Sequence, residues 1–200
     1  GGALPIRGAR VQRRAFQGER GPRLGTVRDL PRIATIATMA SRAQSFVKVI
    51  ADIRPQVDHT FVYLDGYDTV PAFLKEMDRV TVRHAEALGN LHSSSRYLCL
   101  RELSRPAIVF SIDDDIAYPP DYTQRLAELL DKLEGGAIVG VHARLWMPPH
   151  GSYARDVSTI HFGMKLDNHC HVHELGCGTS AFVSDRLPLD PLRFGDIDMD

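Results

Sequence analysis

Five short apolar runs, separated by segments with a helical pattern, constrain the fold of this chain more than any other feature. The runs cover residues 33–38, 61–64, 79–82, 107–112 and 137–141. Apolar, β-branched runs of this length are typical of buried strands. Because strands alternate with helical segments, we expect an α/β fold with a mostly parallel sheet covered by helices on both faces.

Two amphipathic helices are predicted between these strands. The first places Phe46, Val47, Ile50 and Ile53 on its buried face, and the second Leu126, Leu129, Leu130 and Leu133. Ser41 and Asp121 are expected to cap them. Pro55 is expected to end the first helix and Gly135-Gly136 the second. Shorter helices are predicted from Pro71 to Met77 and over 97–103.

The last third of the chain has a different character. After Arg144 the sequence consists of loops and short alternating segments such as 157–162. We expect a small antiparallel or mixed addition to the main sheet. Residues 1–31 lack apolar periodicity and are interpreted as a basic arm or linker. Residues 32–200 then form a single domain, which matches the size of the 200-residue chain.

Charge is distributed unevenly along the chain. Residues 1–32 carry eight arginines against two acidic residues, a net charge of +6, which leaves −7 for the rest of a chain whose total is −1. A nucleic-acid-binding domain carries positive charge across its folded face, so no nucleic-acid partner is expected. The arm itself is interpreted either as a linker or as a contact with anionic lipid head groups or a partner domain.

Cysteine content and hydropathy bear on the location. Three cysteines do not make a disulfide framework. No apolar run approaches the roughly 20 residues that span a bilayer, and the arginine-rich start lacks the pattern of a secretory signal. We expect a cytoplasmic protein that can act at the inner face of the membrane. The opening Gly1-Gly2 indicates a processed start or a fragment.

An acidic triplet follows the most apolar run. Asp113, Asp114 and Asp115 come directly after residues 107–112, at the carboxyl end of a strand, where open α/β sheets bind ligands. Mg²⁺ and Mn²⁺ prefer carboxylate oxygens and often share substrate phosphate. In an extended turn Asp113 and Asp115 point one way and Asp114 the other. The alternative is a solvated acidic turn before a helix N-terminus.

These residues carry a resemblance to a known family. The stretch Phe110–Tyr122 (FSIDDDIAYPPDY) resembles the DXD region of bacterial family 2-like glycosyltransferases with the GT-A fold, a Rossmann-like architecture. Residues 32–38 with Arg42 resemble the family's first strand and nucleotide-binding turn. Residues 61–67 resemble its second strand and base-contacting loop, and residues 176–182 (GCGTSAF) its glycine-rich acceptor-side strand. Together these segments span residues 32–200.

The resemblance implies a metal-dependent, inverting transfer of a sugar from a nucleoside-diphosphate sugar, a UDP-sugar first, to a hydroxyl of a glycan or glycolipid, in bacterial surface polysaccharide synthesis. Manganese or Mg²⁺ is the implied cofactor. The implied nucleotide contacts are Thr38, Arg42, Asp65, Asp113 and Asp114. The implied metal ligands are Asp113 and Asp115, with His173 completing the shell.

The family's general base lies downstream of the glycine-rich strand. The matching residues are Asp196, Asp198 and Asp200, of which we favour Asp198. The resemblance also implies that the C-terminal part of the family's domain is truncated in this chain. Where many relatives carry a Gly-Lys pair before the DXD strand, this loop has His92 and Arg96, either of which can face phosphate.

A histidine-rich segment and the single tryptophan are further candidates. His169, His171 and His173 share one face if the segment is an alternating strand, which suits zinc, although the paired-ligand spacing of zinc sites is absent. The other interpretation is a set of polar strand residues lining a substrate cleft. Trp146 lies in a proline-bounded loop and either stacks on a sugar, acts as a lid, or packs in the core.

Three alternatives to a glycosyltransferase were weighed. An Asp-x-Asp phosphatase places its nucleophile after the first strand, whereas three other strands come before the one that ends at this triplet. A sugar nucleotidyltransferase needs a glycine-rich loop after the first strand, and Thr38–Arg42 contains no glycine. A non-catalytic sugar- or nucleotide-binding module of the same fold predicts binding without turnover.

Overall fold

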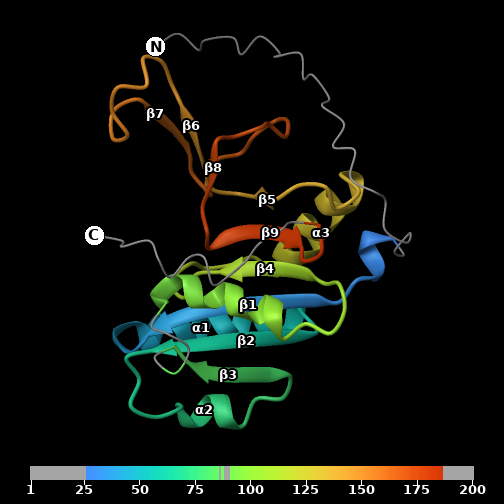
Figure 1. Ribbon diagram of the computed structural model, residues 1–200, viewed down its shortest axis with the longest axis vertical. Helices are drawn as coiled ribbons and strands as arrows, with labels where there is room; N and C mark the ends of the chain where they lie inside the picture. The colour runs from blue at the N-terminus through green and yellow to red at the C-terminus, as the bar shows by residue number, and fades with distance from the viewer. Residues whose placement is uncertain (1–25, 86, 88–90, 187–200) are drawn as a thin grey trace.

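A six-stranded sheet forms the centre of the computed structural model, which describes residues 26–85, 87 and 91–186. The strand order is β3-β2-β1-β4-β9-β5 (Figure 1). Strands β1 to β4 run parallel, and β9 runs antiparallel to both β4 and β5. The strands are β1 (Arg32–Met39), β2 (His59–Asp65), β3 (Val80–His84), β4 (Ile108–Ile112), β5 (Val139–Gly140) and β9 (Thr179–Val183).

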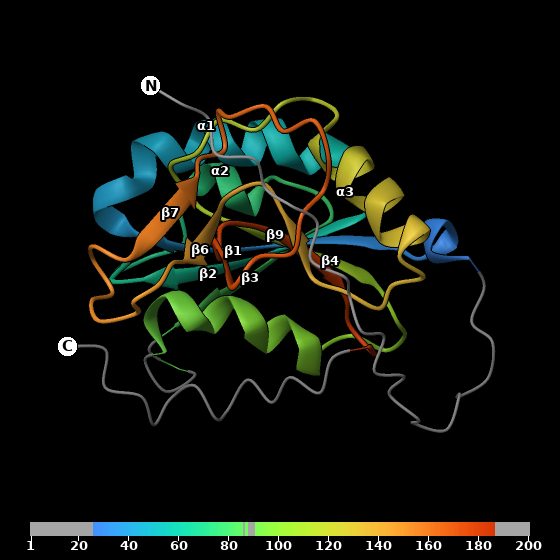
Figure 2. The ribbon, with the colours of Figure 1, turned by 90° about the horizontal axis from the view of Figure 1, so that it is seen from above.

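Helices cover both faces of this sheet. The α-helices α1 (Ala43–Ile53), α2 (Ala72–Lys75) and α3 (Tyr122–Lys132) lie on one side, and the 3-10 helix η5 (His92–Arg101) lies on the other (Figure 2). Short 3-10 turns occupy Val27–Asp29, Ala40–Arg42 and Arg54–Gln56. The expected α/β class, with a mostly parallel mixed sheet and helices on both faces, is therefore confirmed.

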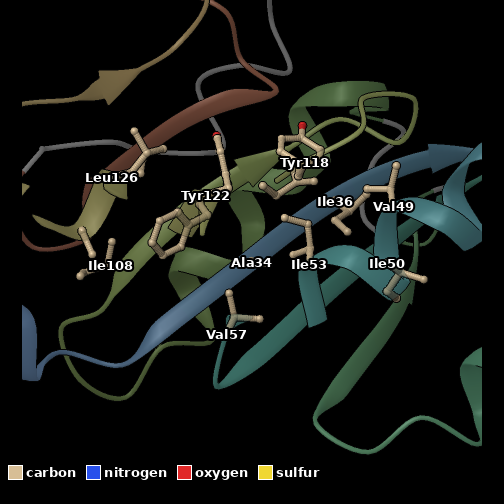
Figure 3. Close-up of a cluster of buried hydrophobic side chains, with 14 of the residues drawn as sticks. Ala34, Ile36, Val49, Ile50, Ile53, Val57, Ile108, Tyr118, Tyr122 and Leu126 are labelled. Atoms are coloured by element: carbon tan, nitrogen blue, oxygen red, sulfur yellow. The ribbon is translucent and has the colours of Figure 1, made fainter. Parts of the chain in front are cut away.

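The core has two parts because alternate residues of a strand face opposite sides of the sheet. Ala34 and Ile36 of β1 join the larger cluster with α1 and α3 (Figure 3). Ile33 and Ala37 join the smaller cluster, which packs against Leu98 of η5. Both clusters are built from side chains that are almost completely shielded from solvent, so β1 and β4 are central, doubly covered strands.

A separate three-stranded antiparallel sheet projects beyond the β5 side of the main sheet (Figure 1). It consists of β7 (Val157–Ile160), β6 (Ala143–Trp146) and β8 (Glu174–Leu175), in that order. This unit is the antiparallel addition expected from the short alternating segments. Its strand β8 continues within a few residues into β9, which returns the chain to the main sheet.

The first helix differs from its prediction in two respects. Val47 is 43% exposed, and Val49 takes its place among the buried residues. Ser41 does not cap the helix, because it lies within the preceding 3-10 turn and the helix begins at Ala43. The α-helix therefore starts one residue later than a cap at Ser41 predicts, with Arg42 in the N-cap position.

The second helix and its flanks also need correction. Asp121 is in the N-cap position but makes no capping hydrogen bond, since its carboxylate accepts from the Arg125 side chain instead. Leu133 is 46% exposed because the helix has ended before it. The helix ends at Lys132, and Gly135, with a φ of +70°, lies in the turn that follows, together with Glu134 at +54°. The run predicted as a strand over 137–141 pairs only at Val139–Gly140.

Other boundaries moved as well. The helix predicted over 97–103 is a 3-10 helix over 92–101, and the one predicted over 71–77 is confined to 72–75. Residues 26–31, assigned to the arm, belong to the folded unit, since Val27 packs in the core. Within the described part of the chain, no helix is long and apolar enough to cross a membrane.

Candidate functional site

The carboxyl ends of the parallel strands bring most of the predicted site residues to one edge of the sheet. Met39, the last residue of β1, is in register with Asp65, the last residue of β2. On the other side of β1, Ile36 is in register with Ile112, after which the aspartates follow. Ligands of open α/β sheets bind at this edge, because the loops that leave the strands converge there.

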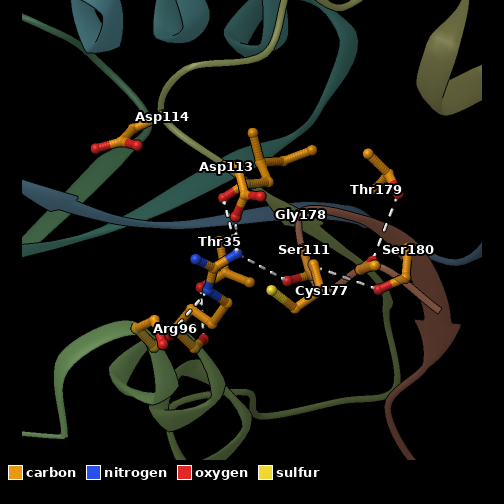
Figure 4. A network of polar contacts seen from close by, with 12 residues as sticks. Thr35, Arg96, Ser111, Asp113, Asp114, Cys177, Gly178, Thr179 and Ser180 are labelled. Carbon is orange, nitrogen blue, oxygen red and sulfur yellow. Dashed lines mark hydrogen bonds and ion pairs between the residues drawn. The ribbon is translucent and has the colours of Figure 1, made fainter. Parts of the chain in front are cut away.

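Asp113 is held by a buried arginine. Its Oδ1 lies 2.7 Å from Nη1 of Arg96, whose side chain is only 5% exposed (Figure 4). The same guanidinium donates to the carbonyls of Ser93 (2.8 Å) and Ile112 (3.2 Å). Burial, the largest single cause, lowers the pKa of Arg96, but the charge of Asp113, its hydrogen bond and the nearby Cys177 and Tyr97 together outweigh it, and the net shift is upward. Arg96 therefore stays charged and fixes the carboxylate.

A tyrosine secures the backbone of the same residue. The N–H of Asp113 donates to the Tyr118 hydroxyl over 2.9 Å, and that hydroxyl donates to the carbonyl of Gly178. Burial raises the pKa of Tyr118 well above its ordinary value, so the hydroxyl remains protonated. The hydroxyl thus ties the end of β4 to the turn before β9.

Gly178 leaves the space that the Asp113 side chain occupies. A Cβ atom built on Gly178 would lie 1.9 Å from Cγ of Asp113 and 2.0 Å from its Oδ2. Carbon atoms in contact are normally separated by about 3.5–4.0 Å. The glycine is therefore needed here for close approach, and the carboxylate rests directly on the backbone of the neighbouring turn.

Asp114 and Asp115 share a second arginine. Nη1 of Arg42 lies 3.1 Å from Oδ1 of Asp114 and 3.1 Å from Oδ2 of Asp115. Asp114 is 4% exposed in its side chain and Asp115 47%. The hydrogen bond to Asp114, followed by its charge and that of Asp115, raises the pKa of Arg42.

The extended alternation predicted for the triplet is wrong in part. Asp113 points toward Arg96 whereas Asp114 points away from it, as expected (Figure 4). Asp115, however, is directed to Arg42, the same arginine that Asp114 contacts, and not to the Arg96 side with Asp113. The reason is local geometry: residues 114–115 form a turn, in which the two-residue alternation of a strand does not hold.

The predicted nucleotide contacts at the ends of β1 and β2 lie at the same edge of the sheet but have different surroundings. Thr38 is 2% exposed, and its hydroxyl lies 3.4 Å from the hydroxyl of Tyr67. Asp65 lies 3.1 Å from Nδ1 of His92, at the start of η5. Helix η5 thus supplies two residues to this edge, since His92 contacts Asp65 and Arg96 contacts Asp113.

The histidine segment does not form the predicted alternating strand, because residues 169–173 have no regular structure. His173 lies on the small sheet, where its Nδ1 accepts from the N–H of Trp146 over 3.0 Å. Within residues 26–85, 87 and 91–186, no three His, Cys, Asp or Glu side chains gather in a group that holds a metal ion by itself. The predicted bases Asp196 and Asp198, like Asp200, lie outside the described residues.

The small sheet has a hollow of about 250 Å³ near this edge, lined by His142, Arg144, Tyr153, Glu174 and Gly176 among others. Trp146 packs edge-on against Tyr153, with ring centroids 5.3 Å apart. The guanidinium of Arg144 lies over the same tyrosine ring, 5.1 Å from its centroid. Gly176 of the lining lies two residues before Gly178, and Gly178 lies directly against Asp113. This short segment therefore connects the hollow to the aspartates.

Two site residues were missed by reasoning from the sequence. In the sequence, Tyr118 is only part of the stretch after the aspartates, and Gly178 only one glycine of a glycine-rich strand. Their roles depend on a contact between residues 60 positions apart, which no local pattern reveals. Arg96 was noted as phosphate-facing, and the structure directs it to Asp113 instead.

The chemistry of this edge suits a cation next to an anionic ligand. Two arginines pair with the three carboxylates, which leaves a net charge of −1 for a bound cation to offset. Asp115 remains half exposed. Because Mg²⁺ and Mn²⁺ are usually bound by one or two carboxylates together with substrate phosphate, the residues present fit such an ion without a complete protein cage.

Comparison with known proteins adds no assignment. No family model matches the sequence, and no curated protein matches it significantly.

Proposed function

We propose that this protein is a glycosyltransferase with the GT-A fold, which transfers a sugar from a nucleoside-diphosphate sugar to a hydroxyl of a glycan or glycolipid acceptor. The observation that carries the proposal is the convergence of Asp113, Asp114 and Asp115 with Arg42 at the carboxyl edge of a parallel sheet. In such sheets this edge is where nucleotides bind.

The proposal divides the three carboxylates between two tasks. Asp115 is exposed and, with Asp113, would hold Mn²⁺ or Mg²⁺, which supplies charge neutralisation for the departing diphosphate. Asp114 is buried against Arg42 and would keep that arginine in place. Arg42 itself is 46% exposed in its side chain, so its guanidinium remains accessible to a phosphate oxygen.

Arg96 and Gly178 act as positioning residues in this proposal. The guanidinium of Arg96 fixes one oxygen of Asp113, and Gly178 bounds the carboxylate on another side. A rigid carboxylate does not need to be reorganised when the donor binds, which is the condition for effective electrostatic stabilisation. Asp65 and Thr38 are proposed at the ribose and base side of the donor.

The small sheet would form the acceptor side. Tyr153, Arg144 and Glu174 present an aromatic face beside charged groups around the 250 Å³ hollow. Ligand sites commonly combine apolar or aromatic walls with a few polar groups that orient the ligand. Asp198, or else Asp196, is proposed as the base that takes the proton of the acceptor hydroxyl. Synthesis of a bacterial surface polysaccharide is the corresponding proposed role.

Calorimetric titration tests the donor part of this proposal. The purified chain is titrated with UDP, GDP, CDP and ADP, first with Mn²⁺ and then with EDTA. We expect one nucleotide to bind only with the metal. Asp115→Ala should weaken this binding at least about tenfold while the domain stays folded, because a charge-assisted contact is lost.

Asp167→Ala is the matched control, since Asp167 is an exposed carboxylate in the loop between β7 and β8. It should bind like the wild type. Metal-dependent binding that Asp115→Ala retains in full contradicts the assigned role of the triplet. Binding of a nucleotide without release of sugar from any donor, in the presence of acceptor glycans, would favour the non-catalytic module.

A further inference from the structure

The opposite edge of the main sheet has a hollow that the proposed function does not use. It has a volume of about 590 Å³ and lies where β1, β2, β3 and β4 begin. Four arginines line it: Arg28, Arg32, Arg79 and Arg105. We call it the amino-edge hollow. Strand β1 has eight residues, so roughly 23 Å separates this edge from the aspartates.

Backbone hydrogen bonds at the strand starts hold this edge together. The carbonyl of Pro31 accepts from Ile108 N–H, and the carbonyl of Arg32 accepts from Asp58 N–H, both over 2.8 Å. The carbonyl of Arg79 accepts from Thr60 N–H over 2.9 Å. Arg32 and Arg79 are therefore attached to the rigid sheet and do not lie on a free loop.

The acidic residues of the hollow are already engaged. Asp58 accepts a hydrogen bond from the N–H of Arg32 over 2.8 Å. Asp29 accepts one from the Thr26 hydroxyl over 2.6 Å. Four arginines against these two carboxylates leave a charge of +2 on the lining.

The four arginines differ in their partners. Arg28 pairs with Asp131 over 2.5 Å, and Arg79 bonds the carbonyl of Val57 over 3.2 Å and lies 3.5 Å from Asp78. For Arg32 and Arg105, by contrast, no side-chain hydrogen bond or ion pair joins the guanidinium to another described residue. Two cationic groups thus line the same hollow without a side-chain partner among the described residues.

The backbone of Arg79 is a separate observation. Its φ is +56°, a left-handed conformation that is sterically unfavourable for a residue other than glycine. A strained backbone maintained by the surrounding structure is a frequent property of ligand sites. Here the strained residue is also one of the four arginines.

From these observations we propose that the amino-edge hollow binds a phosphate-bearing anion, with Arg32 and Arg105 donating to its oxygens and Arg79 lining the site. Guanidinium groups match phosphate because their paired N–H donors fit two oxygens at once. A long polyanion fits poorly, because the chain beyond residue 32 carries −7. This site is independent of the proposed glycosyltransferase activity.

Calorimetry with inorganic phosphate and inorganic pyrophosphate tests the site directly. EDTA is present throughout, so metal-dependent binding at the aspartates does not contribute. The full chain is compared with Arg32→Gln/Arg105→Gln and with a control of equal charge change, Arg155→Gln/Lys165→Gln, whose residues are exposed on or beside the small sheet. We expect affinity to fall at least about tenfold in the first variant only.

A second measurement separates a soluble phosphate compound from a lipid head group. The same proteins are sedimented with vesicles of phosphatidylcholine alone and of phosphatidylcholine with phosphatidylglycerol. Binding to the anionic vesicles that falls in Arg32→Gln/Arg105→Gln, and not in the control, assigns a lipid source. Phosphate or pyrophosphate binding without such vesicle binding assigns a soluble one.

Two results overturn the proposal. One is the absence of binding to phosphate, pyrophosphate and anionic vesicles by the wild-type chain. The other is binding of any of them that falls equally in both double variants, or in neither, because the arginines of the hollow would then not be its cause. Circular dichroism and thermal unfolding show that each variant is folded, since both pairs of residues lie at the surface.

Discussion

Replacement of Gly178 by alanine is the most direct test of how the acidic site is built. The added Cβ would lie 1.9 Å from Cγ of Asp113, about 1.5–2 Å inside normal contact. The backbone of this turn is tied to Tyr118, so we expect the Asp113 side chain to move. Its 2.7 Å contact with Arg96 is then lost.

Two costs make up the expected magnitude. Forcing an extra carbon into a closely packed place costs about 1–3 kcal/mol. Loss of a hydrogen bond to a charged group costs about 1.5–3 kcal/mol, and Arg96 is left buried without its carboxylate. Together we expect a loss of about 3–5 kcal/mol in the free energy of unfolding. For a domain of this size, that lowers the melting temperature by roughly 6–20 °C.

The assay is equilibrium unfolding in urea, with melting temperature as a second measure. Gly163→Ala is the control, because a Cβ atom at Gly163 meets nothing within 4 Å. It should change stability by less than about 0.5 kcal/mol. The same comparison is made in an Asp113→Ala background, where the obstructing carboxylate is absent. There Gly178→Ala should cost much less, since the two residues are coupled.

A loss below about 1 kcal/mol for Gly178→Ala in the native background refutes this reasoning, because the carboxylate would then not rest on the glycine. An equal loss with and without Asp113 also refutes it, since the cost would come from the backbone of the turn. Nucleotide titration of the same variant connects stability to function, because displaced Asp113 should weaken metal-dependent binding.

The remaining predictions concern two buried groups, Tyr118 and Cys99. Tyr118→Phe leaves the N–H of Asp113 and the carbonyl of Gly178 without their partner, and should lower the free energy of unfolding in urea by about 1–3 kcal/mol. The control Tyr153→Phe, at an exposed tyrosine, should lower it by less than about 0.5 kcal/mol. Equal effects of the two substitutions would contradict the bridging role of Tyr118. Burial raises the pKa of Cys99 to about 12, so a thiol reagent at pH 8 should label two cysteines in the native protein and three in denaturant. Fast labelling of all three cysteines in the native state would contradict the burial of Cys99 in the core. Because the unfolded thiol ionises near pH 8.5, the unfolded state loses its proton first, so stability should fall as pH rises from about 9 to 12, and less so in Cys99→Ala.

The separation of the two proposed sites follows from the topology of the main sheet. Parallel strands place all their carboxyl ends on one side and all their amino ends on the other, so the aspartates and the amino-edge hollow cannot share a ligand. With a donor site at one edge and an anion site at the other, the protein could bind a phosphate-bearing ligand in the amino-edge hollow while the acidic edge remains accessible to the donor. Arg32 begins β1 and Asp113 directly follows the neighbouring strand β4, so these two residues mark the two edges.

Local pattern predicted the larger part of the architecture. Short apolar runs with helical segments between them indicate an α/β sheet because the two-residue and 3.6-residue periods are properties of consecutive residues. The position of Asp113–Asp115 at a strand end follows from the same pattern, and so does the antiparallel addition after Arg144. The predictions that are wrong concern helix ends, namely the cap at Ser41 and the burial of Leu133. At such positions neighbouring turns compete for the same backbone groups, so one residue can shift the end of the helix.

Tertiary structure alone decided how the site is held together. Arg42 contacts Asp114 across 72 positions, and Tyr118 contacts Gly178 across 60. The turn at residues 114–115, which directs Asp115 to Arg42, also overrides the alternation expected of an extended segment. These contacts depend on the order and register of strands, which are set by packing between distant segments and leave no periodic signal in the sequence. Composition and periodicity therefore placed the acidic residues at the sheet edge, and only the folded chain determined which cations and which glycine surround them.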